Sequence, residues 1–306
     1  MKVVVTGRFG QVAQSLAEKA AGRPDVELVM LGRPEFDLTE PDTVQAAIRD
    51  ARPDIVVSAA AYTAVDQAEE EPELAFAVNA KGSQAVALAA RRCGAPIIHI
   101  STDYVFSGTS KEPYSETDLS VPLNVYGRSK LEGEQLVARA NPMHVILRTA
   151  WVYSPFGRNF VRDMLQSAQG RDSVSVVSDQ WGSPTSALDL ADAILRIAGR
   201  LHRRETEAYG TYHLAGADNI SRSKFALAIF AISAAIGGPS AQVTDISAYD
   251  YPARALRPLN SRLNCQKFWA TFRFDLPGWT MSLRPVIERI NRLDIQPIRH
   301  APGRDE

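Results

Sequence analysis

The chain has 306 residues, enough for one large domain or two ordinary ones around a substantial hydrophobic core. Its 34 Lys and Arg residues nearly balance 35 Asp and Glu residues, so the net charge gives no reason to expect nucleic acid or an anionic membrane as a partner. Cys93 and Cys265 fit no metal-ligand spacing, no apolar run approaches the roughly 20 residues of a membrane span, and the first residues do not resemble a signal peptide. We therefore expect a cytoplasmic protein with reduced thiols and no metal site.

A glycine turn follows the first predicted strand. Residues 2–6 are apolar and β-branched, which predicts a strand, and helical spacing runs from Gln11 to about Ala21. Between them, Gly7 permits a tight turn and Gly10 lets the backbone approach a pyrophosphate, while the following helix offers free N–H groups to the anion. This strand, turn and helix predict a dinucleotide-binding site at the start of the chain.

The second predicted strand, Val26–Leu31, ends where dinucleotide folds distinguish a ribose hydroxyl from a ribose 2′-phosphate. Arg33 stands there, and a guanidinium suits a phosphate. Arg33 could instead pair with Glu35 or Asp37, and Asp37 with Leu38 could bracket the adenine. We expect NADPH as the cofactor, with NADH as an alternative.

A third strand, Ile55–Ser58, is followed by small residues over 59–63, which leave room for a flat cofactor. A tightly packed turn would have the same composition. The next stretch, rich in alanine, predicts one long helix from about Pro72 to Cys93 that packs across the sheet.

The fourth strand, Pro96–Ile100, places Thr102 and Asp103 beyond its carboxyl end, where open α/β sheets bind ligands. Both are therefore candidates for contact with a substrate, although an ordinary capping pair would look the same. His99 lies inside the strand pattern and is expected to be a core histidine. The loop from Gly108 to Pro122 could fold over a site.

Tyr126 and Lys130 are the candidate catalytic pair. Their spacing at the start of a predicted helix puts the phenol and the ammonium on one face, one turn apart. A cation beside a phenol favours the phenolate, so we expect Lys130 to lower the pKa of Tyr126 from its usual value of about 10. Such a tyrosine can exchange a proton with an alcohol or carbonyl oxygen. Without a cofactor site upstream, a solvated surface pair would be the simpler interpretation.

A fifth strand near residues 145–148 completes a βαβαβαβαβ alternation, which predicts an α/β fold with a doubly wound parallel sheet. We expect residues 1–153 to form a dinucleotide-binding domain. Residues 154–306 are expected to form mainly a smaller α/β substrate lobe, with segments that return to the sheet. Trp151, after the fifth strand, could stack on a sugar or base, or could fill the seam between the domains.

The second half of the chain is less regular. Its predicted helices lie near residues 159–169, 187–201 and 221–236, and its predicted strands near 173–177 and 210–214. Arg254, Arg257 and Arg262 lie close together near the end, and arginine forks suit a diphosphate. Scattered surface charge is the alternative explanation.

Taken together, the glycine turn, Thr102, Tyr126 and Lys130 resemble the extended short-chain dehydrogenase/reductase family. Six motifs, in order along the chain up to about Leu263, resemble the dTDP-4-dehydrorhamnose reductase family within it: Ala59-Ala-Ala-Tyr-Thr-Ala-Val-Asp66, Ser101-Thr-Asp-Tyr-Val-Phe106, Pro122-Leu-Asn-Val-Tyr-Gly-Arg-Ser-Lys-Leu-Glu-Gly-Glu134, Leu147-Arg-Thr-Ala-Trp-Val-Tyr153, Gly182-Ser-Pro-Thr185 and Arg257-Pro-Leu-Asn-Ser-Arg-Leu263.

This resemblance implies that the chain reduces the C4 ketone of dTDP-4-dehydro-L-rhamnose with NADPH or NADH. By the same similarity Tyr126 is the proton donor, Lys130 holds the nicotinamide ribose and tunes the phenol, and Thr102 hydrogen-bonds near the reacting oxygen. The residues implied for the dinucleotide are Gly10, Gln11, Val12, Asp37, Leu38, Ala61, Tyr62 and Thr63, and those for the sugar nucleotide are Asp103, Trp151, Arg257, Asn260 and Arg262.

Two other functions fit the same motifs. One is a sugar-nucleotide epimerase or 4,6-dehydratase, which would keep its nicotinamide through the cycle. The other is a regulatory subunit without catalysis, although such relatives tend to lose catalytic residues that this chain retains. Some relatives join subunits through magnesium held by glutamates, but this chain has Gln14 and Ser15 there, so we expect any homodimer to lack a magnesium bridge.

Overall fold

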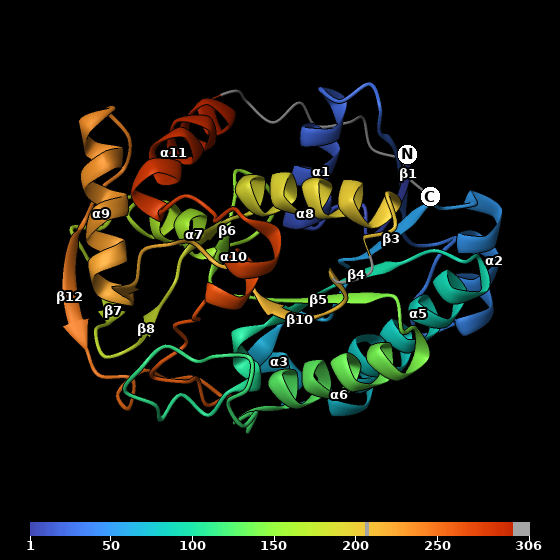
Figure 1. The fold of residues 1–306 in the computed structure, drawn as a ribbon. Helices are drawn as coiled ribbons and strands as arrows, with labels where there is room; N and C mark the ends of the chain where they lie inside the picture. The colour runs from blue at the N-terminus through green and yellow to red at the C-terminus, as the bar shows by residue number, and fades with distance from the viewer. Residues whose placement is uncertain (206–207, 296–306) are drawn as a thin grey trace, which may run out of the picture.

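The computed structural model describes residues 1–205 and 208–295. Its centre is a sheet of six parallel strands in the order β10-β5-β4-β3-β1-β2 (Figure 1). The strands are β1 (Lys2–Thr6), β2 (Glu27–Leu31), β3 (Ile55–Ser58), β4 (Ile97–Thr102), β5 (His144–Thr149) and β10 (Gly210–His213). The predicted α/β fold with a doubly wound parallel sheet is confirmed.

The chain reverses direction across the sheet at β1. β2 pairs with one edge of β1, and β3 pairs with the other edge, so the connections that leave β1 and β3 run to opposite sides. Thr6, the last residue of β1, accepts hydrogen bonds through its hydroxyl from the backbone N–H groups of Ala59 (3.0 Å) and Ala60 (3.1 Å). This topological switch point opens a crevice at the carboxyl ends of the strands, where α/β folds bind ligands.

Helices cover both faces of the sheet, because its strands are apolar on both sides. Val3, Val5 and Ile98 face one core, and Val56 and Ile146 face the other. The first core lies under α1 (Gln11–Ala21), α8 (Ala187–His202) and α10 (Gln266–Phe272), and the second under α2 (Pro41–Ala51), α5 (Ser83–Arg92) and α6 (Val125–Ala140). The sheet is thus a rigid base whose strand ends carry the site.

The helix predicted over residues 72–93 is present, but the structure divides it into segments of different helical type. The short helix α3 (Val65–Ala68) comes first, and α4 (Pro72–Phe76) then passes into the π-helical segment η1 (Ala77–Gly82) before α5 begins. π-Helical turns often occur at functional sites. Here the turn carries the buried Asn79, whose amide bonds both backbone groups of Tyr62 at 2.8 and 3.0 Å. A helical periodicity does not reveal this local widening, because the hydrophobic pattern continues through it.

The second lobe packs around Tyr153, Phe225 and Leu283. Its helices are α7 (Phe160–Ser167), α9 (Arg222–Ala235) and α11 (Trp279–Ile295), and its small sheets pair β7 (Ser173–Val177) with β12 (Gln242–Ile246), β6 (Val152–Tyr153) with β9 (Thr185–Ser186), and β8 (Trp181–Gly182) with β11 (Ile220–Ser221). Between these pieces the chain returns to the central sheet, since α8 packs on α1 and β10 pairs with β5. The strand β12 and the helices α10 and α11 were not predicted from the sequence.

Residues 1–205 and 208–295 contain neither a candidate membrane span nor a candidate metal cluster. No helix there is long and apolar enough to cross a membrane. No group of three or more His, Cys, Asp or Glu residues in the same part of the chain could hold a metal ion.

Candidate active site

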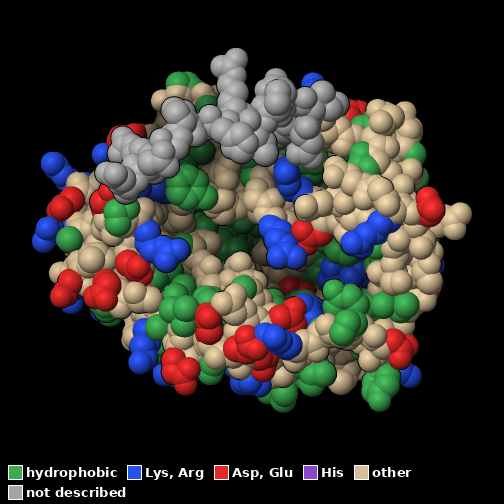
Figure 2. All heavy atoms as spheres, turned by 180° about the vertical axis from the view of Figure 1, so that it is seen from behind, with side chains coloured by type: hydrophobic (Ala, Val, Ile, Leu, Met, Phe, Trp, Pro, Cys, Tyr) green, Lys and Arg blue, Asp and Glu red, His purple; other side chains and the backbone are tan. Residues whose placement is uncertain are grey.

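A cavity of about 990 Å³ lies at the carboxyl ends of the strands and brings most of the predicted site residues together. Seen from behind, the molecule is hollowed near the middle of this face, with Lys and Arg side chains around the hollow (Figure 2). The predicted residues that line the cavity are Gly7, Gly10, Gln11, Val12, Arg33, Asp37, Leu38, Ala61, Thr63, Thr102, Asp103, Tyr126, Lys130 and Trp151. Tyr62, Arg257, Asn260 and Arg262 do not line it.

The glycine turn has the geometry of a pyrophosphate cradle. Gly7 has φ of +99°, a conformation in which a side chain would be strained. A Cβ at Gly10 would meet no protein atom within 4 Å, so the space above this residue is open. Helix α1 begins at Gln11, and its first N–H groups face an anion bound there. The turn therefore fits the diphosphate of a dinucleotide.

Arg8 and Arg33 lie together at the end of β2, where the adenosine ribose of a bound dinucleotide would lie. Arg8 forms an ion pair with Glu35 (Nη1 to Oε2, 3.1 Å) and donates a hydrogen bond to the backbone oxygen of Arg33. Arg33 makes no hydrogen bond or ion pair through its side chain with any residue in the described ranges, so it does not pair with Glu35 or Asp37. The pKa of Asp37 is lowered chiefly by bonds from Thr39. The Arg33 guanidinium is thus open to a phosphate.

Tyr62 contributes to the cavity through its backbone, which holds the neighbouring residues in place. Its phenol donates to Glu71 Oε2 at 2.7 Å, and burial, followed by this bond, raises the pKa of the phenol to about 12. Its backbone is clamped by Asn79, which also donates to Ser129 Oγ on the catalytic helix at 2.9 Å. Tyr62 therefore positions its neighbours Ala61 and Thr63, which line the cavity.

The first turn of α6 fixes the position of Tyr126. Asn124 caps the helix by accepting from the N–H of Gly127 at 2.7 Å, and Glu69 Oε1 accepts from the N–H of Val125 at 2.7 Å. Side-chain acceptors at a helix start satisfy N–H groups that have no partner within the helix. The Asn124 amide also donates to the Leu256 carbonyl at 2.7 Å, which ties the helix to the far end of the chain.

Tyr126 is a protonated phenol in this environment. Burial raises its pKa, and contact with the hydroxyl of Thr102 lowers it without cancelling the rise. The ring of Tyr104 packs edge-on against it, with 5.7 Å between ring centroids. The expected net lowering of this pKa by Lys130 is therefore wrong for this structure, because the phenol is enclosed and the ammonium points elsewhere.

Lys130 is held by the neighbouring strand β4. Its Nζ donates to the Ile100 carbonyl at 2.7 Å and lies 3.4 Å from Nε2 of His99, whose Nδ1 is 3.1 Å from Oγ of Ser58. Burial lowers the pKa of Lys130 to about 8 and holds the pKa of His99 well below its usual value. An ammonium donor requires Nε2 to accept, so Nδ1 carries the hydrogen. His99 is the expected core histidine, but it also positions Lys130.

The sugar side of the cavity carries Asp103 and Trp151. The hydroxyl of Thr102 donates to Asp103 Oδ1 at 3.0 Å, and burial raises the pKa of Asp103 to about 6. Trp151 has φ of +46°, and a Cβ on Gly182 would lie 2.2 Å from its ring. Gly182 therefore makes the space in which the indole lies beside the cavity.

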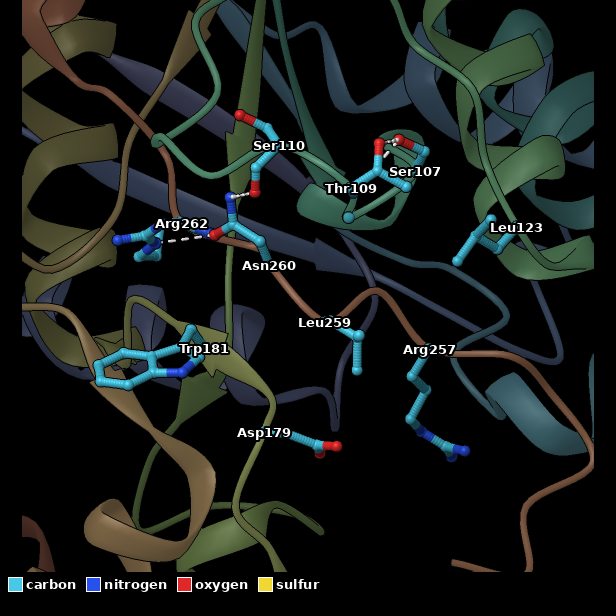
Figure 3. Close-up of a pocket in the computed structure, with 11 residues that line it drawn as sticks. Ser107, Thr109, Ser110, Leu123, Asp179, Trp181, Arg257, Leu259, Asn260 and Arg262 are labelled. Atoms are coloured by element: carbon cyan, nitrogen blue, oxygen red, sulfur yellow. Dashed lines mark hydrogen bonds between the residues drawn. The ribbon is translucent and has the colours of Figure 1, made fainter. Parts of the chain in front are cut away.

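Arg257, Asn260 and Arg262 line a second pocket of about 660 Å³ (Figure 3). The Asn260 amide donates to the carbonyls of Ser110 (2.9 Å) and Glu112 (2.8 Å), and Arg262 donates to Asn260 Oδ1 at 2.8 Å. The polar atoms of Asn260 and Arg262 therefore hold the loop that begins at Gly108.

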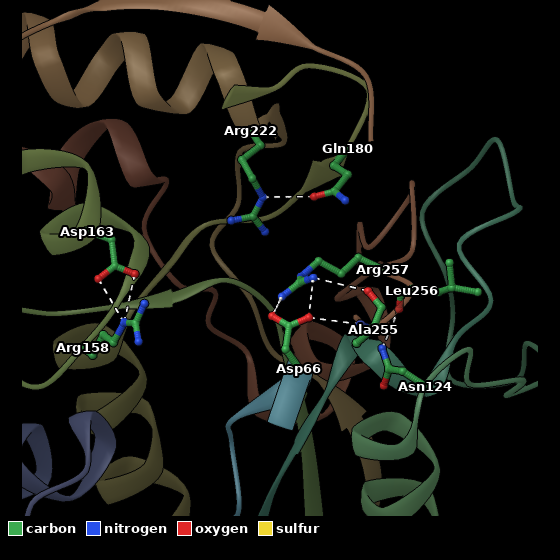
Figure 4. A network of polar contacts seen from close by, with 9 residues as sticks. All are labelled: Asp66, Asn124, Arg158, Asp163, Gln180, Arg222, Ala255, Leu256 and Arg257. Carbon is green, nitrogen blue, oxygen red and sulfur yellow. Dashed lines mark hydrogen bonds and ion pairs between the residues drawn. The ribbon is translucent and has the colours of Figure 1, made fainter. Parts of the chain in front are cut away.

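Arg257 is held by a carboxylate. Its two terminal nitrogens contact Asp66 at 2.6 and 3.1 Å, and Asp66 also accepts from the N–H of Ala255 (Figure 4). Asp66 belongs to α3 and was not singled out by sequence reasoning. Neither was Arg222, which lines the cavity from the start of α9. A single basic residue at a helix start carries no recognisable sequence signal.

Known proteins match this chain over nearly its whole length. The family profile described as the RmlD substrate binding domain matches residues 1–292. A dTDP-4-dehydrorhamnose reductase of Sinorhizobium fredii is 53% identical over 288 residues, which cover 94% of this chain and 97% of the relative. The enzyme of that name from Escherichia coli K12 is 38% identical, with 95% and 98% covered.

Solved structures agree. A dTDP-4-dehydrorhamnose reductase of Clostridium acetobutylicum superposes with a TM-score of 0.88 at 36% identity, covering 95% of this chain and 100% of the other. The Bacillus anthracis protein of that name, in complex with NADP, gives 0.84 at 34% identity, with 96% and 98% covered. A UDP-glucose 4-epimerase of Thermus thermophilus, at 20% identity and a TM-score of 0.75, shares the fold. The chain therefore belongs to the RmlD family, that of the dTDP-4-dehydrorhamnose reductases.

Proposed function

We propose that the chain reduces the C4 ketone of dTDP-4-dehydro-L-rhamnose to give dTDP-L-rhamnose, with a nicotinamide dinucleotide as reductant. One observation carries this proposal: a protonated Tyr126 stands beside Thr102 in the same cavity as an open pyrophosphate cradle. Relatives that bear this enzyme's name and are 38 to 53% identical over nearly the whole chain support the choice of substrate.

The roles of the catalytic residues follow from their contacts. When bound, the nicotinamide supplies the hydride to the sugar C4. Tyr126 gives its proton to the C4 oxygen as negative charge develops there, and Thr102, whose hydroxyl contacts the phenol, lies beside the reacting oxygen. Lys130, fixed by Ile100 and His99, offers its remaining N–H to the nicotinamide ribose and adds positive charge near the phenolate.

The cofactor we propose is NADPH, with NADH used less well. Arg33 has no acidic partner among the residues in the described ranges, and Arg8 lies beside it. Two guanidinium groups at the end of β2 suit a 2′-phosphate. Gly7, Gly10, Gln11 and Val12 would hold the diphosphate, Asp37 and Leu38 the adenosine, and Ala61, Tyr62 and Thr63 the nicotinamide half.

On the substrate side we propose that Asp103 and Trp151 contact the sugar, and that Arg257 reaches the nucleotide from the second pocket. Asn260 and Arg262 would shape that pocket, since their polar atoms already bond the protein. Residues 1–153 would act mainly on the cofactor and the later residues mainly on the substrate.

We also propose that any homodimer lacks a magnesium bridge through α1. Gln14 bonds the carbonyl of Phe9 at 2.7 Å, and Ser15 is fully buried, so neither side chain offers a metal ligand to a partner. A molar mass in solution that is unchanged by a chelator is the expected result.

The test is a cofactor-oxidation assay with dTDP-4-dehydro-L-rhamnose, and with its UDP counterpart, using each cofactor in turn. We expect stoichiometric oxidation of NADPH and formation of the 4-hydroxy sugar. Tyr126→Phe keeps the ring but removes the proton, so turnover should fall by about 10²- to 10⁴-fold while dinucleotide affinity stays near normal. Conversion of a sugar nucleotide without net cofactor oxidation would instead identify an epimerase or a dehydratase.

A further inference from the structure

Arg222 is a cation on the cavity wall without an acidic partner. Its Nε donates to Gln180 Oε1 at 3.2 Å, and its two terminal nitrogens have no hydrogen-bond partner among the residues that the structure describes. No carboxylate in the described ranges forms an ion pair with it, and burial lowers its pKa. Asp103 attracts this guanidinium without forming an ion pair with it, so the charge of Arg222 is only partly compensated within the protein and its environment favours a bound anion.

Two other arginines near the cavity have their charge balanced by a carboxylate. Arg257 is paired with Asp66, and Arg158 with Asp163 at 3.3 Å, whereas Arg222 in the same view meets only the neutral amide of Gln180 (Figure 4). Among the three arginines drawn in Figure 4, Arg222 is therefore the one without a carboxylate partner, and its charge remains available to a ligand.

Two aromatic rings fix the plane of the guanidinium. The Cζ of Arg222 lies 4.1 Å from the ring centre of Trp151 and 4.8 Å from that of Phe160. Stacking of this kind holds an arginine by its faces and leaves the N–H edge free for a bidentate contact. Trp151 and Phe160 both line the cavity, so the free edge belongs to the ligand site.

The charged groups that act on Arg222 belong to the substrate side. Besides burial, its pKa responds to Tyr104 and Asp103, which follow β4, and to Tyr251 and Arg257 from the last part of the chain, but not to any group of the glycine turn. Tyr104 in turn packs against Tyr126. In a 4-keto sugar nucleotide the diphosphate leaves the ring at C1, opposite C4, so it lies about one ring width from the phenol that protonates the C4 oxygen.

We propose that Arg222 binds the diphosphate of the sugar-nucleotide substrate through its two terminal nitrogens, with Trp151, Phe160 and Gln180 holding it in place. This inference rests on the proposed function for the identity of the sugar nucleotide. The chemistry it requires is a nucleoside diphosphate, and binding can be measured without turnover.

The experiment compares dTDP with dTMP by titration calorimetry, and NADPH by its fluorescence, for the unmodified chain and for Arg222→Gln. Loss of a charged bidentate contact should weaken dTDP binding by about 10- to 100-fold, leave dTMP much less affected, and change NADPH affinity by less than about twofold. Arg222→Lys keeps the charge but not the fork or the stacking, so a smaller loss of about three- to tenfold is expected. This second variant also keeps the test valid if Arg222→Gln does not fold.

Arg196→Gln is the matched control, because Arg196 also stacks on a ring, with Cζ 3.6 Å from the centre of Phe274, but does not line the cavity. It should bind dTDP like the unmodified chain. Unchanged dTDP affinity in both Arg222 variants, an equal loss for dTDP and dTMP, or a comparable loss for NADPH would overturn the inference. If the chain binds dTDP through Arg222 but does not reduce the ketone, the proposed function is rejected while the diphosphate site at Arg222 is retained.

Discussion

The proposed cofactor end and the proposed substrate end of the cavity are built in different ways. The cofactor end comes from short continuous stretches that follow β1, β2 and β3, so residues close in sequence do related work. The substrate end takes Asp103, Trp151 and Arg222 from three distant parts of the chain, with Gln180 and Asp66 as supports. A site made of turns can be recognised from local sequence, whereas one made of side chains from several elements depends on how those elements pack.

Breaking a buried ion pair next to the cavity residue Ser101, which donates to Glu134, should have the largest effect on stability. Glu134 of α6 and Arg148 of β5 form an ion pair at 2.7 Å, with 5% and 8% of their side chains exposed. Arg148→Met leaves Glu134 charged and unpaired in the interior, which typically costs about 3–5 kcal/mol. Urea unfolding measures this, and we expect a large fall in the urea concentration at the midpoint for Arg148→Met.

The control for that change is Arg284→Met. Arg284 pairs with Glu288 one turn away on the surface of α11, at 3.6 Å, and such pairs contribute about 0.3–0.5 kcal/mol. Similar urea midpoints for the two variants would contradict the importance of the buried pair.

The cofactor end can be tested through the 2′-phosphate. Arg33→Ala should weaken NADPH by about 10- to 100-fold, because a charged contact contributes about 1.5–3 kcal/mol, and should leave NADH affinity nearly unchanged. Arg8→Ala should have a smaller effect, since Arg8 is already paired with Glu35. Fluorescence titrations with both cofactors measure this, and equal losses for NADPH and NADH would remove the assignment.

Lys130 makes cofactor binding depend on pH. Its pKa is lowered to about 8, so the ammonium is present below that pH and is lost as the pH rises through it. If the ammonium holds the ribose, NADPH should bind about tenfold more weakly at pH 9 than at pH 7. Lys130→Met should bind weakly at both values, and a wild-type affinity that stays flat over this range would contradict the role.

The smallest expected effect is that of Asn260→Ala, which distinguishes a structural role of Asn260 from direct contact with the substrate. Asn260→Ala removes two bonds to the loop carbonyls, which should cost about 1 kcal/mol and lower the melting temperature by about 2–4 °C. Affinity for dTDP should remain close to normal, in contrast to Arg222→Gln. An unchanged melting temperature together with weak dTDP binding would instead favour direct contact with the substrate.

Two expectations from the sequence were incomplete or wrong for identifiable reasons. The helix predicted over residues 72–93 forms, but its middle turn, η1, is π-helical and carries Asn79, which bonds Tyr62 and Ser129. The expected lowering of the Tyr126 pKa did not occur, because enclosure outweighs a cation that is bonded to β4. Both features depend on tertiary contacts, which the spacing of residues along a helix does not encode.

The sequence alone predicted the parallel sheet, the glycine turn and the placing of Tyr126 and Lys130 on one helix, because the alternation of strands and helices and the spacing of these residues can be read along the chain. Only the tertiary structure decided which charged groups remain free. Arg257 was one of three arginines expected at the diphosphate, yet Asp66 pairs with it, while Arg222 has no ion-pair partner in the described ranges and stacks on two rings. Compensation is a property of groups brought together from opposite ends of the chain, so it emerges only when the chain has folded.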